Sequence, residues 1–412
     1  MHSGEHMRVS SNQFQKVAID SMLDQQAKLS KVQEQVATGK KITKPSEDPV
    51  AAARVVKLQD ILKTVDQFQS NINSARSRLT LEESALADTV SIYHRIRELT
   101  IQANNASQTN ETRGFIAEEM AQLLEELVAL GNATDSSGEF LFAGNKGKFK
   151  PFAKNATGGY DYHGDDGRRK IQIGPGRQIS INDSGSDVFR EIRDGNGTFA
   201  VLESSRNRGT GVVDPGAVTG NYDLGTFAIV FDRKQSIDPN EPVTYSVVDD
   251  KGNQVIPPGQ IFNDGNAIEF AGIHTFIKGE PEPGDYFVVR PSFHQDIFKT
   301  IHDFSEALKV GRGTEADFAA LNNHANRILV SMDTALGSVL ETRANVGARL
   351  NALESQENIN ESVRVEVRKI LSDVEDLDYA KAVSELNLKL TGLQASQKAF
   401  TRVQDISLFD FI

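Results

Sequence analysis

Apolar residues recur every seven positions through two long stretches of the chain. A repeat of this kind places one apolar stripe along a helix, and it predicts that two helices pair along that stripe as a coiled coil. At about 1.5 Å per residue, one helix over 49–104 would be roughly 80 Å long. The first series comprises Leu58, Val65, Ile72, Leu79, Leu86 and Tyr93, and the second Phe318, Ala325, Met332, Val339, Val346 and Leu353. A shorter series follows in Tyr379, Leu386, Leu393 and Phe400.

The middle of the chain has a different composition. Ten of the 12 prolines and 20 of the 32 glycines fall between Pro151 and Asp296. These residues mark turns, and the segments between them, such as TFAIVF and DYFVVRP, are rich in β-branched and aromatic residues. The VVDDKGNQVI segment predicts a β-hairpin with its turn at 250–252. We therefore expect an all-β domain over 151–296.

Two helical flanks around one insertion constrain the topology. The simplest arrangement packs the N-terminal and C-terminal helices side by side and antiparallel, with both chain ends at one end and the β domain at the other. The predicted fold is multidomain: a long antiparallel α-helical coiled-coil rod from both chain ends, with an all-β domain inserted in the middle. Such a fold has a long surface and no obvious cleft, which suits a building block.

The segment TGKKITKPSEDPVAAAR, at 38–54, predicts a sharp break between two helices. Gly39 is suited to end a helix, because glycine adopts a positive φ without steric cost. Asp48 followed by Pro49 has the pattern of an N-cap and a first helical residue. With Pro45 between these ends, we predict a hinge at Gly39, Pro45, Asp48 and Pro49. The three lysines of the segment fit either a solvated turn or a contact with an acidic partner.

Composition excludes several classes of function. The chain has 57 acidic and 45 basic residues, a net charge of -12, and no long Lys/Arg run, which argues against nucleic-acid binding. No apolar run approaches the roughly 18 residues of a membrane helix, and the first thirty residues lack the apolar segment of a Sec-type signal peptide. Because cysteine is absent, disulfides, thiol catalysis and thiolate metal sites are excluded.

The polar clusters of the sequence do not predict a reaction centre. The segment YHGDDGRR brings His163, Asp165 and Asp166 together, but within a glycine-rich turn this pattern favours a solvated loop over a metal site. The segment DGNGT, at 194–198, resembles the start of a calcium loop but lacks the bidentate glutamate at the twelfth position. We therefore predict no catalytic, cofactor-binding or metal-binding residue, no cofactor and no enzymatic activity.

The two terminal segments are weakly amphipathic. The first has an apolar stripe diluted by glutamine and serine, and the last closes on DISLFDFI, which leaves apolar side chains uncovered. We expect both segments to be loose in the isolated protein and to fold on contact with other subunits. The predicted assembly interface comprises Phe14, Met22, Leu29, Val36, Leu386, Leu390, Leu393, Phe400, Leu408 and Phe409.

Four segments resemble the flagellar hook-associated protein 3 family. They are MRVSSNQF at 7–14, QEQVATGKKITKPSEDPVAAAR at 33–54, SSGEFLFAGNKGKFKPF at 136–152, and the closing segment, DLDYAKAVSELNLKLTGLQASQKAFTRVQDISLFDFI, at 376–412. The resemblance covers both flanks but not the β insertion. It implies terminal polymerisation helices at 1–48 and 379–412, a helical rod domain at 49–150 and 297–378, and an outer β-rich domain at 151–296. In this scheme the hinge articulates the first two domains.

The resemblance also implies a function. The family is related to flagellin and forms the second junction layer between the bacterial hook and the filament. We therefore expect a structural junction protein, required for filament assembly and motility, exported by the flagellar type III pathway to the extracellular flagellum. The implied partners are copies of itself in a ring, the first hook-associated junction protein, flagellin and a flagellar export chaperone, with no nucleic acid and no membrane.

Two other functions compete with this expectation. One is a secreted coiled-coil adhesin or effector that uses the β domain as a binding head, and the other is flagellin itself. An effector would not need both termini to be patterned. The ending SLFDFI fits the junction family better than flagellin.

Overall fold

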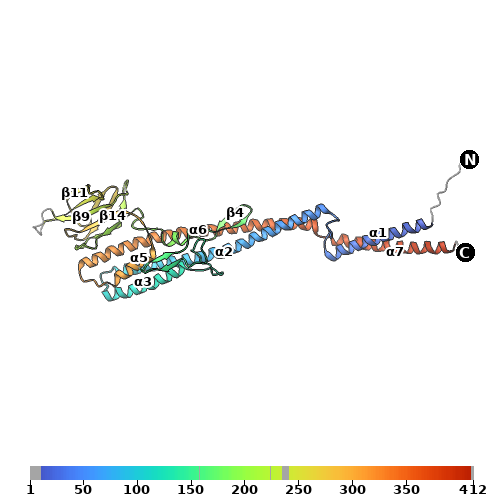
Figure 1. The fold of residues 1–412 in the computed structure, drawn as a ribbon, viewed down its shortest axis with the longest axis horizontal. Coiled ribbons are helices and arrows are strands. Elements are labelled where there is room, and N and C mark those ends of the chain that lie inside the picture. Colours follow the sequence, from blue (N-terminus) through green and yellow to red (C-terminus); the bar gives the residue numbers. More distant parts are fainter. Residues whose placement is uncertain (1–10, 157, 223, 234–240, 410–412) are drawn as a thin grey trace. The chain divides into compact units, whose positions relative to one another are not determined.

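The computed structural model describes residues 11–156, 158–222, 224–233 and 241–409 (Figure 1). Contacts divide the chain into two units. The first combines residues up to Ser70 with those from Gln356 onward, and the second is Asn71–Ser355. Both units draw on both helical flanks of the sequence.

Long helices form the flanks. Their bounds are α1 Ser11–Thr38, α2 Pro49–Ala103, α3 Asn110–Gly131, α5 Ile297–Lys309, α6 Glu315–Glu375 and α7 Tyr379–Phe409. In the second unit α2 and α6 run antiparallel, since Glu83 pairs with Arg343 while Arg97, further along α2, pairs with the earlier Asp333. None of the described helices has an apolar stretch long enough to span a membrane.

The heptad residues form the core of the helical flanks. Ile72, Leu79 and Leu86 of α2 are completely buried, as are Ala325, Val339, Val346 and Leu353 of α6. Leu58 and Val65 are buried in the first unit. The predicted stripe is wrong at one end: Phe318 is 38% exposed and lies near the start of α6. There its ring faces the Arg113 guanidinium, 5.2 Å from the ring centroid, rather than an apolar partner.

Short antiparallel strands fill the middle of the chain, as predicted. Their bounds are β1 Phe152–Lys154, β2 Tyr160–Tyr162, β3 Lys170–Gly174, β4 Arg177–Ser180, β5 Ile192–Arg193, β6 Phe199–Glu203, β7 Val212–Val213, β8 Ala217–Val218, β9 Phe227–Arg233, β10 Val243–Asp249, β11 Gln254–Ile261, β12 Ala267–Phe270, β13 Ile273–Lys278, β14 Tyr286–Pro291 and β15 His294–Gln295. A short helix, α4 (Gly185–Phe189), lies between β4 and β5.

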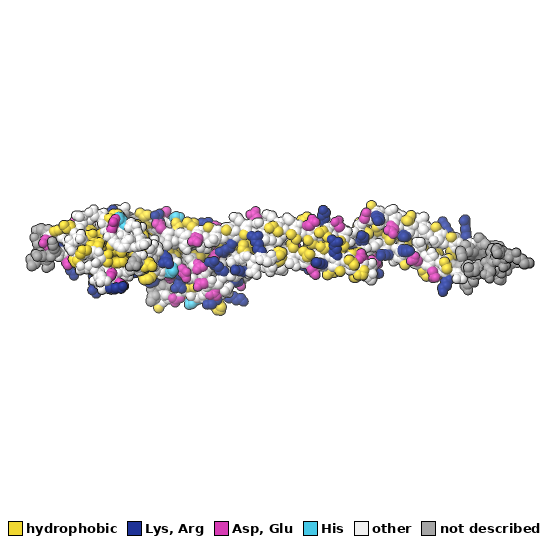
Figure 2. Space-filling view, turned by 90° about the horizontal axis from the view of Figure 1, so that it is seen from above, with side chains coloured by type: hydrophobic (Ala, Val, Ile, Leu, Met, Phe, Trp, Pro, Cys, Tyr) yellow, Lys and Arg dark blue, Asp and Glu magenta, His cyan; other side chains and the backbone are white. Residues whose placement is uncertain are grey.

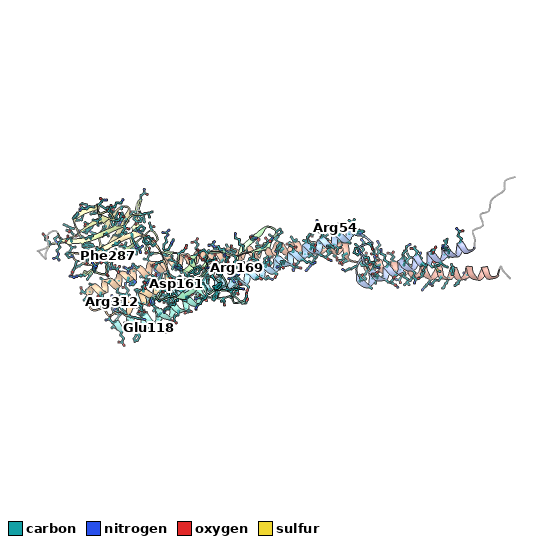
Figure 3. All side chains as sticks on the ribbon, viewed as in Figure 1. Arg54, Glu118, Asp161, Arg169, Phe287 and Arg312 are labelled. Carbon is teal, nitrogen blue, oxygen red and sulfur yellow. The ribbon has the colours of Figure 1, made fainter. Side chains whose placement is uncertain are left out.

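Strands β6 to β14 form two sheets around a core of their own. One sheet has the order β11-β10-β9-β14-β6, and the other joins β12, β13, β7 and β8. Phe231 and Phe287 are almost fully buried in this core, and Figure 3 labels Phe287. The predicted hairpin is confirmed as β10–β11, where Gly252 has a φ of 81° and the Asp249 N–H donates to the Asn253 carbonyl at 3.0 Å. We call residues 195–291 the β lobe.

The first strands of the predicted β block pack elsewhere. Phe152 of β1 and Phe189 of α4 lie against Phe298 of α5, with ring centroids 5.0 and 5.3 Å away, inside the core that the helices build. The block 151–296 is therefore not one packing unit, because residues 152–192 share the helical core and only the β lobe has a separate one. A high density of glycine and proline indicates turns. Because turns occur both in residues 152–192 and in the β lobe, composition could not show that the two segments belong to different cores.

The chain enters and leaves the β lobe at one place. β5 pairs with β15, with Arg193 opposite His294, and the Asp194 N–H donates to the Phe293 carbonyl at 2.9 Å. Hydrogen bonds join the lobe to α6: the Asn323 side chain accepts from the Val213 N–H at 2.8 Å and donates to the Gly211 carbonyl at 3.0 Å. The lobe is thus attached through two neighbouring strands and a hydrogen-bonded contact.

This attachment predicts that the β lobe can be removed. Replacing residues 195–292 with a short Gly/Ser linker from Asp194 to Phe293 should leave the helical core folded, because its apolar residues come from other segments. Circular dichroism should show the helical signal and a single helical melting transition. Within the shortened protein, Phe189→Ala should still lower the free energy of unfolding by about 3–5 kcal/mol. Loss of the helical fold on removal of the lobe would contradict the division of the two cores.

Candidate assembly interface and hinge

The connection between α1 and α2 has the local chemistry of two helix ends. Gly39 follows α1 with a φ of +71°, and its N–H donates to the Gln35 carbonyl at 2.9 Å. Pro49 is the first residue of α2, and the Asp48 carboxylate accepts from the Ala51 N–H at 2.9 Å. Pro45 lies in a turn that the Glu47 N–H closes onto the Lys44 carbonyl. The helices end and begin where the sequence predicts, while the role of this connection as a hinge stays a prediction.

The connection between α6 and α7 is a second break between helices, and it is hydrogen-bonded to the connection between α1 and α2. α6 ends at Glu375 and α7 begins at Tyr379. The Lys41 N–H donates to the Glu375 carbonyl at 2.7 Å, and the Leu377 N–H donates to the Gly39 carbonyl at 3.0 Å. The domain bounds implied by the resemblance place a boundary at 378/379, but the contact of this second break with the first was not predicted. Asp378 could have revealed the break, because it directly precedes α7 and accepts from the Lys381 N–H at 3.1 Å as an N-cap.

Lysines of the connection pair with carboxylates of the same unit. The Lys40 ammonium lies 2.5 Å from Glu375, and Lys44 lies 3.6 Å from Glu34. Both lysine side chains are more than half exposed. Ion pairs this exposed contribute little to the free energy of folding. These ion pairs therefore favour one arrangement of the connection without adding much to its stability.

The terminal helices α1 and α7 lie side by side and antiparallel (Figure 1). Leu29 of α1 and Ala382 of α7 are buried. Of the predicted interface residues, Met22, Val36, Leu386, Leu390, Leu393 and Phe400 are half-buried. Their three- and four-residue spacing on α7 marks the side that faces α1. The side chains of Phe14, Leu408 and Phe409 lie outside those the structure describes.

Other apolar side chains of the terminal helices are uncovered. Leu388 is 71% exposed, Val17 63% and Leu23 57%. Figure 2 shows hydrophobic side chains of this kind at the surface, interspersed with charged ones. None of the three is among the predicted interface residues: Val17 belongs to the apolar stripe of the first segment but was not selected from it, whereas Leu23 and Leu388 lie outside the stripes from which that set was drawn. A second apolar set outside the stripe would have been the signal to look for.

Comparison with known proteins gives matches over both flanks. Residues 9–147 match the family model of the bacterial flagellin N-terminal helical region, and residues 329–412 match that of the C-terminal helical region. The chain is 26% identical to flagellar hook-associated protein 3 of Escherichia coli (strain K12) over 406 residues, which are 98% of this chain and 99% of that protein.

Solved structures extend this similarity. Flagellar hook-associated protein 3 from Legionella pneumophila is 31% identical with a TM-score of 0.73, over 78% of this chain and 98% of that one. A structure of the flagellar junction protein FlgL from the same species is 31% identical with a TM-score of 0.68, over 73% of this chain and 99% of the other. The matched lengths place the β lobe inside the similarity as well as the helices.

Gly39 should be the most sensitive residue of the connection. An alanine there would adopt a positive φ, and its Cβ would lie 2.9 Å from the Tyr379 hydroxyl. We expect Gly39→Ala to destabilise the first unit by about 1–3 kcal/mol. Gly392→Ala is the matched control, since it lies within α7 with nothing within 4 Å of the added Cβ, and it should stabilise by up to about 1 kcal/mol.

Thermal unfolding by circular dichroism, with hydrogen exchange of α1 and α7, measures both changes. Adding Tyr379→Phe to Gly39→Ala removes the hydroxyl oxygen and should recover the steric part of the loss. Equal stability of Gly39→Ala and the wild type would show that the two breaks are not packed together.

Proposed function

Because the chain belongs to the flagellar hook-associated protein 3 family, we propose that it is a structural junction protein that links the bacterial flagellar hook to the flagellin filament. The observation that carries the proposal is the uncovered apolar surface on the terminal helices. Leu388, Val17 and Leu23 project from segments that match the flagellin helical regions. A helix pair with apolar side chains on its outer faces is suited to pack against further helices.

The same surface supports specific partners. We propose that the paired terminal helices contact other copies of this chain in a ring, with the first hook-associated junction protein on one side of the ring and flagellin on the other. Delivery would use the flagellar type III pathway and an export chaperone that covers the terminal helices beforehand. The similarity to flagellar proteins supports an assembly role rather than an enzymatic one.

The half-buried stripe and the exposed residues have different roles in this proposal. Leu393 lies on the side of α7 that faces α1, so a charge there would disturb the helix pair itself. Leu388 lies on the outer side, where it is free to contact another subunit. Those predicted interface residues whose side chains the structure describes therefore shape the helix pair. Leu388, which was not predicted, is exposed and would join subunits, so it is the better target for a test.

Leu388→Asp tests the proposal. Because Leu388 is 71% exposed, the substitution should change the free energy of unfolding by less than about 0.5 kcal/mol. In an assembled junction the carboxylate would be buried without a partner, which costs several kcal/mol. In a strain that lacks its own copy, we expect hooks without filaments, flagellin released into the medium and no swimming.

Two variants serve as controls. Leu388→Met keeps an apolar side chain of similar size and should restore filaments and swimming. Leu393→Asp should lower the melting temperature of the isolated protein, which Leu388→Asp should not. Normal filaments with Leu388→Asp would show that Leu388 is not part of the interface. If the protein were instead an adhesin or effector, deletion of the whole gene would leave swimming unaffected.

A further inference from the structure

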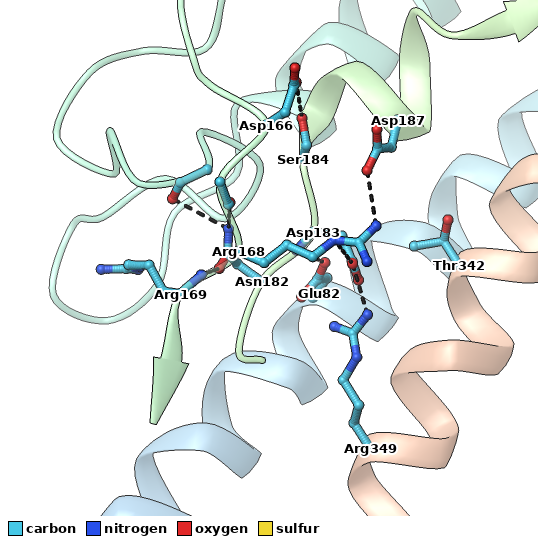
Figure 4. A network of polar contacts seen from close by, with 12 residues as sticks. Glu82, Asp166, Arg168, Arg169, Asn182, Asp183, Ser184, Asp187, Thr342 and Arg349 are labelled. Atoms are coloured by element: carbon cyan, nitrogen blue, oxygen red, sulfur yellow. Dashed lines mark hydrogen bonds and ion pairs between the residues drawn. The ribbon is translucent and has the colours of Figure 1, made fainter. Parts of the chain in front are cut away.

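Three buried or nearly buried charged side chains meet where the β hairpins join the long helices (Figure 4). Glu82 comes from α2 and is completely buried, and Asp183, 3% exposed, lies in the loop 181–184 that follows β4. Arg349 comes from α6. The cluster thus joins a loop to both of the long helices in the second unit.

The contacts leave one oxygen of each carboxyl group unused. Glu82 Oε1 accepts from the Asp183 N–H at 3.0 Å, and Arg349 Nη2 donates to Asp183 Oδ1 at 2.7 Å. Glu82 Oε2 and Asp183 Oδ2 are buried and have no hydrogen-bond donor among the described residues. The two carboxyl groups are close enough that the negative charge of Asp183 raises the pKa of Glu82. Two ionised carboxylates can only accept, so a bond between them requires a proton on one.

The surrounding charges leave Glu82 without a cation of its own. Arg78, buried one turn earlier on α2, acts on Glu82, but its guanidinium is bonded to Asp135 and lies 3.8 Å from Glu139. The guanidinium of Arg168 lies 3.6 Å from Asp183 Oδ1, but its side chain is 53% exposed and also pairs with Asp187 of α4. The other nearby ions are paired with one another: Arg169 with Glu139, and Glu83 of α2 with Arg343 of α6. Two ionised carboxylates would therefore share one largely buried arginine.

A proton resolves this imbalance. Keeping a second buried carboxylate ionised without its own cation costs more than protonating it. Burial, together with the negative charge of Asp183, raises the pKa of Glu82 to about 8, and the attraction of Arg349 only partly opposes the shift.

The loop that carries Asp183 is tied to the hairpins around it. The Asn182 side chain accepts from the Arg169 N–H at 2.7 Å and donates to the Gly144 carbonyl at 3.3 Å. The Ser184 hydroxyl donates to Asp166 at 3.0 Å. Because these hydrogen bonds tie the loop to the segments around it, the contact between Asp183 and Glu82 also helps to hold those segments against α2.

We propose that Glu82 holds a proton in the closed structure and, with Asp183 and Arg349, forms a pH-sensitive lock that fixes the loop 181–184 and its hairpins onto α2 and α6. The lock is closed in acid and weakens as the pH rises. This proposal concerns the folded monomer and is independent of the proposed function.

The direction follows from proton linkage. In the opened state Glu82 is in water and titrates near its ordinary pKa of 4.5, whereas in the closed state it keeps its proton up to about pH 8. Opening therefore releases a proton between these two values, and the equilibrium constant for opening rises by about tenfold per pH unit in that range. Above about pH 8 the closed state is ionised as well, so the constant levels off.

Hydrogen exchange at pH 6 and pH 8 tests the lock. The observed rates of peptides that cover 181–189 are divided by the intrinsic rates of the same unfolded peptides, which gives the opening constant at each pH. We expect it to rise by about fiftyfold to hundredfold in the wild type and by less than about threefold in Glu82→Gln, which keeps the shape and cannot ionise. Glu83→Gln, one residue along α2, is the matched control and should behave like the wild type.

A second readout reports the proton directly. The infrared spectrum at pH 7 should contain the carbonyl band of a protonated carboxylic acid, and Glu82→Gln should abolish it. If Glu82→Gln does not fold, Asp183→Asn replaces it, because an amide donor would stabilise an ionised Glu82 and should likewise remove the band and the pH dependence. An opening constant that changes equally in the wild type and the variant, or a wild-type spectrum without the band, would overturn the proposal.

Discussion

The burial of two apolar stripes, one on α2 and one on α6, holds the long helices together. Ile72, Leu79 and Leu86 of α2 belong to the same hydrophobic core as Val339 and Val346 of α6, and all of them are removed from water. Full burial of a side chain of this size contributes roughly 1.5–3 kcal/mol, so a few heptads supply most of what two long helices need. Modest helix propensity is then sufficient, because packing rather than local preference holds the helices together.

The sequence predicted this pairing because a heptad repeat reports directly on which side of a helix is buried. It also predicted the helix ends at Gly39 and Pro49 and the hairpin around Gly252, since each depends on the chemistry of a few neighbouring residues. It failed where burial depends on distant partners. Phe318 continues the repeat but faces Arg113, and Phe152 lies in a glycine-rich block but belongs to the helical core.

The candidate site was predictable to a smaller degree. Hydrophobic spacing identified the stripe of α7 with Leu386 and Leu393, yet a single chain cannot show whether a stripe faces its own partner helix or another subunit. Leu388, the more exposed residue, carries no periodic signal. Glu82 looks like an ordinary polar residue of an amphipathic helix. The Glu82 carboxyl group is removed from water only by the loop that carries Asp183. Asp183 lies 101 positions later in the sequence, so the sequence around Glu82 does not indicate this contact.

The pairing of Arg193 with His294 has a consequence for how the chain folds. The flanks that form the helical core are separated by a β lobe of roughly 100 residues. If that segment were disordered, closing it would cost about 3 kcal/mol more in chain entropy than closing a loop of a few residues. Once the β lobe folds on its own, its ends lie together and the two flanks behave as neighbours in sequence. The β lobe takes no part in the helical core. By folding on its own, it nevertheless lowers the entropy cost of bringing together the two flanks that form this core.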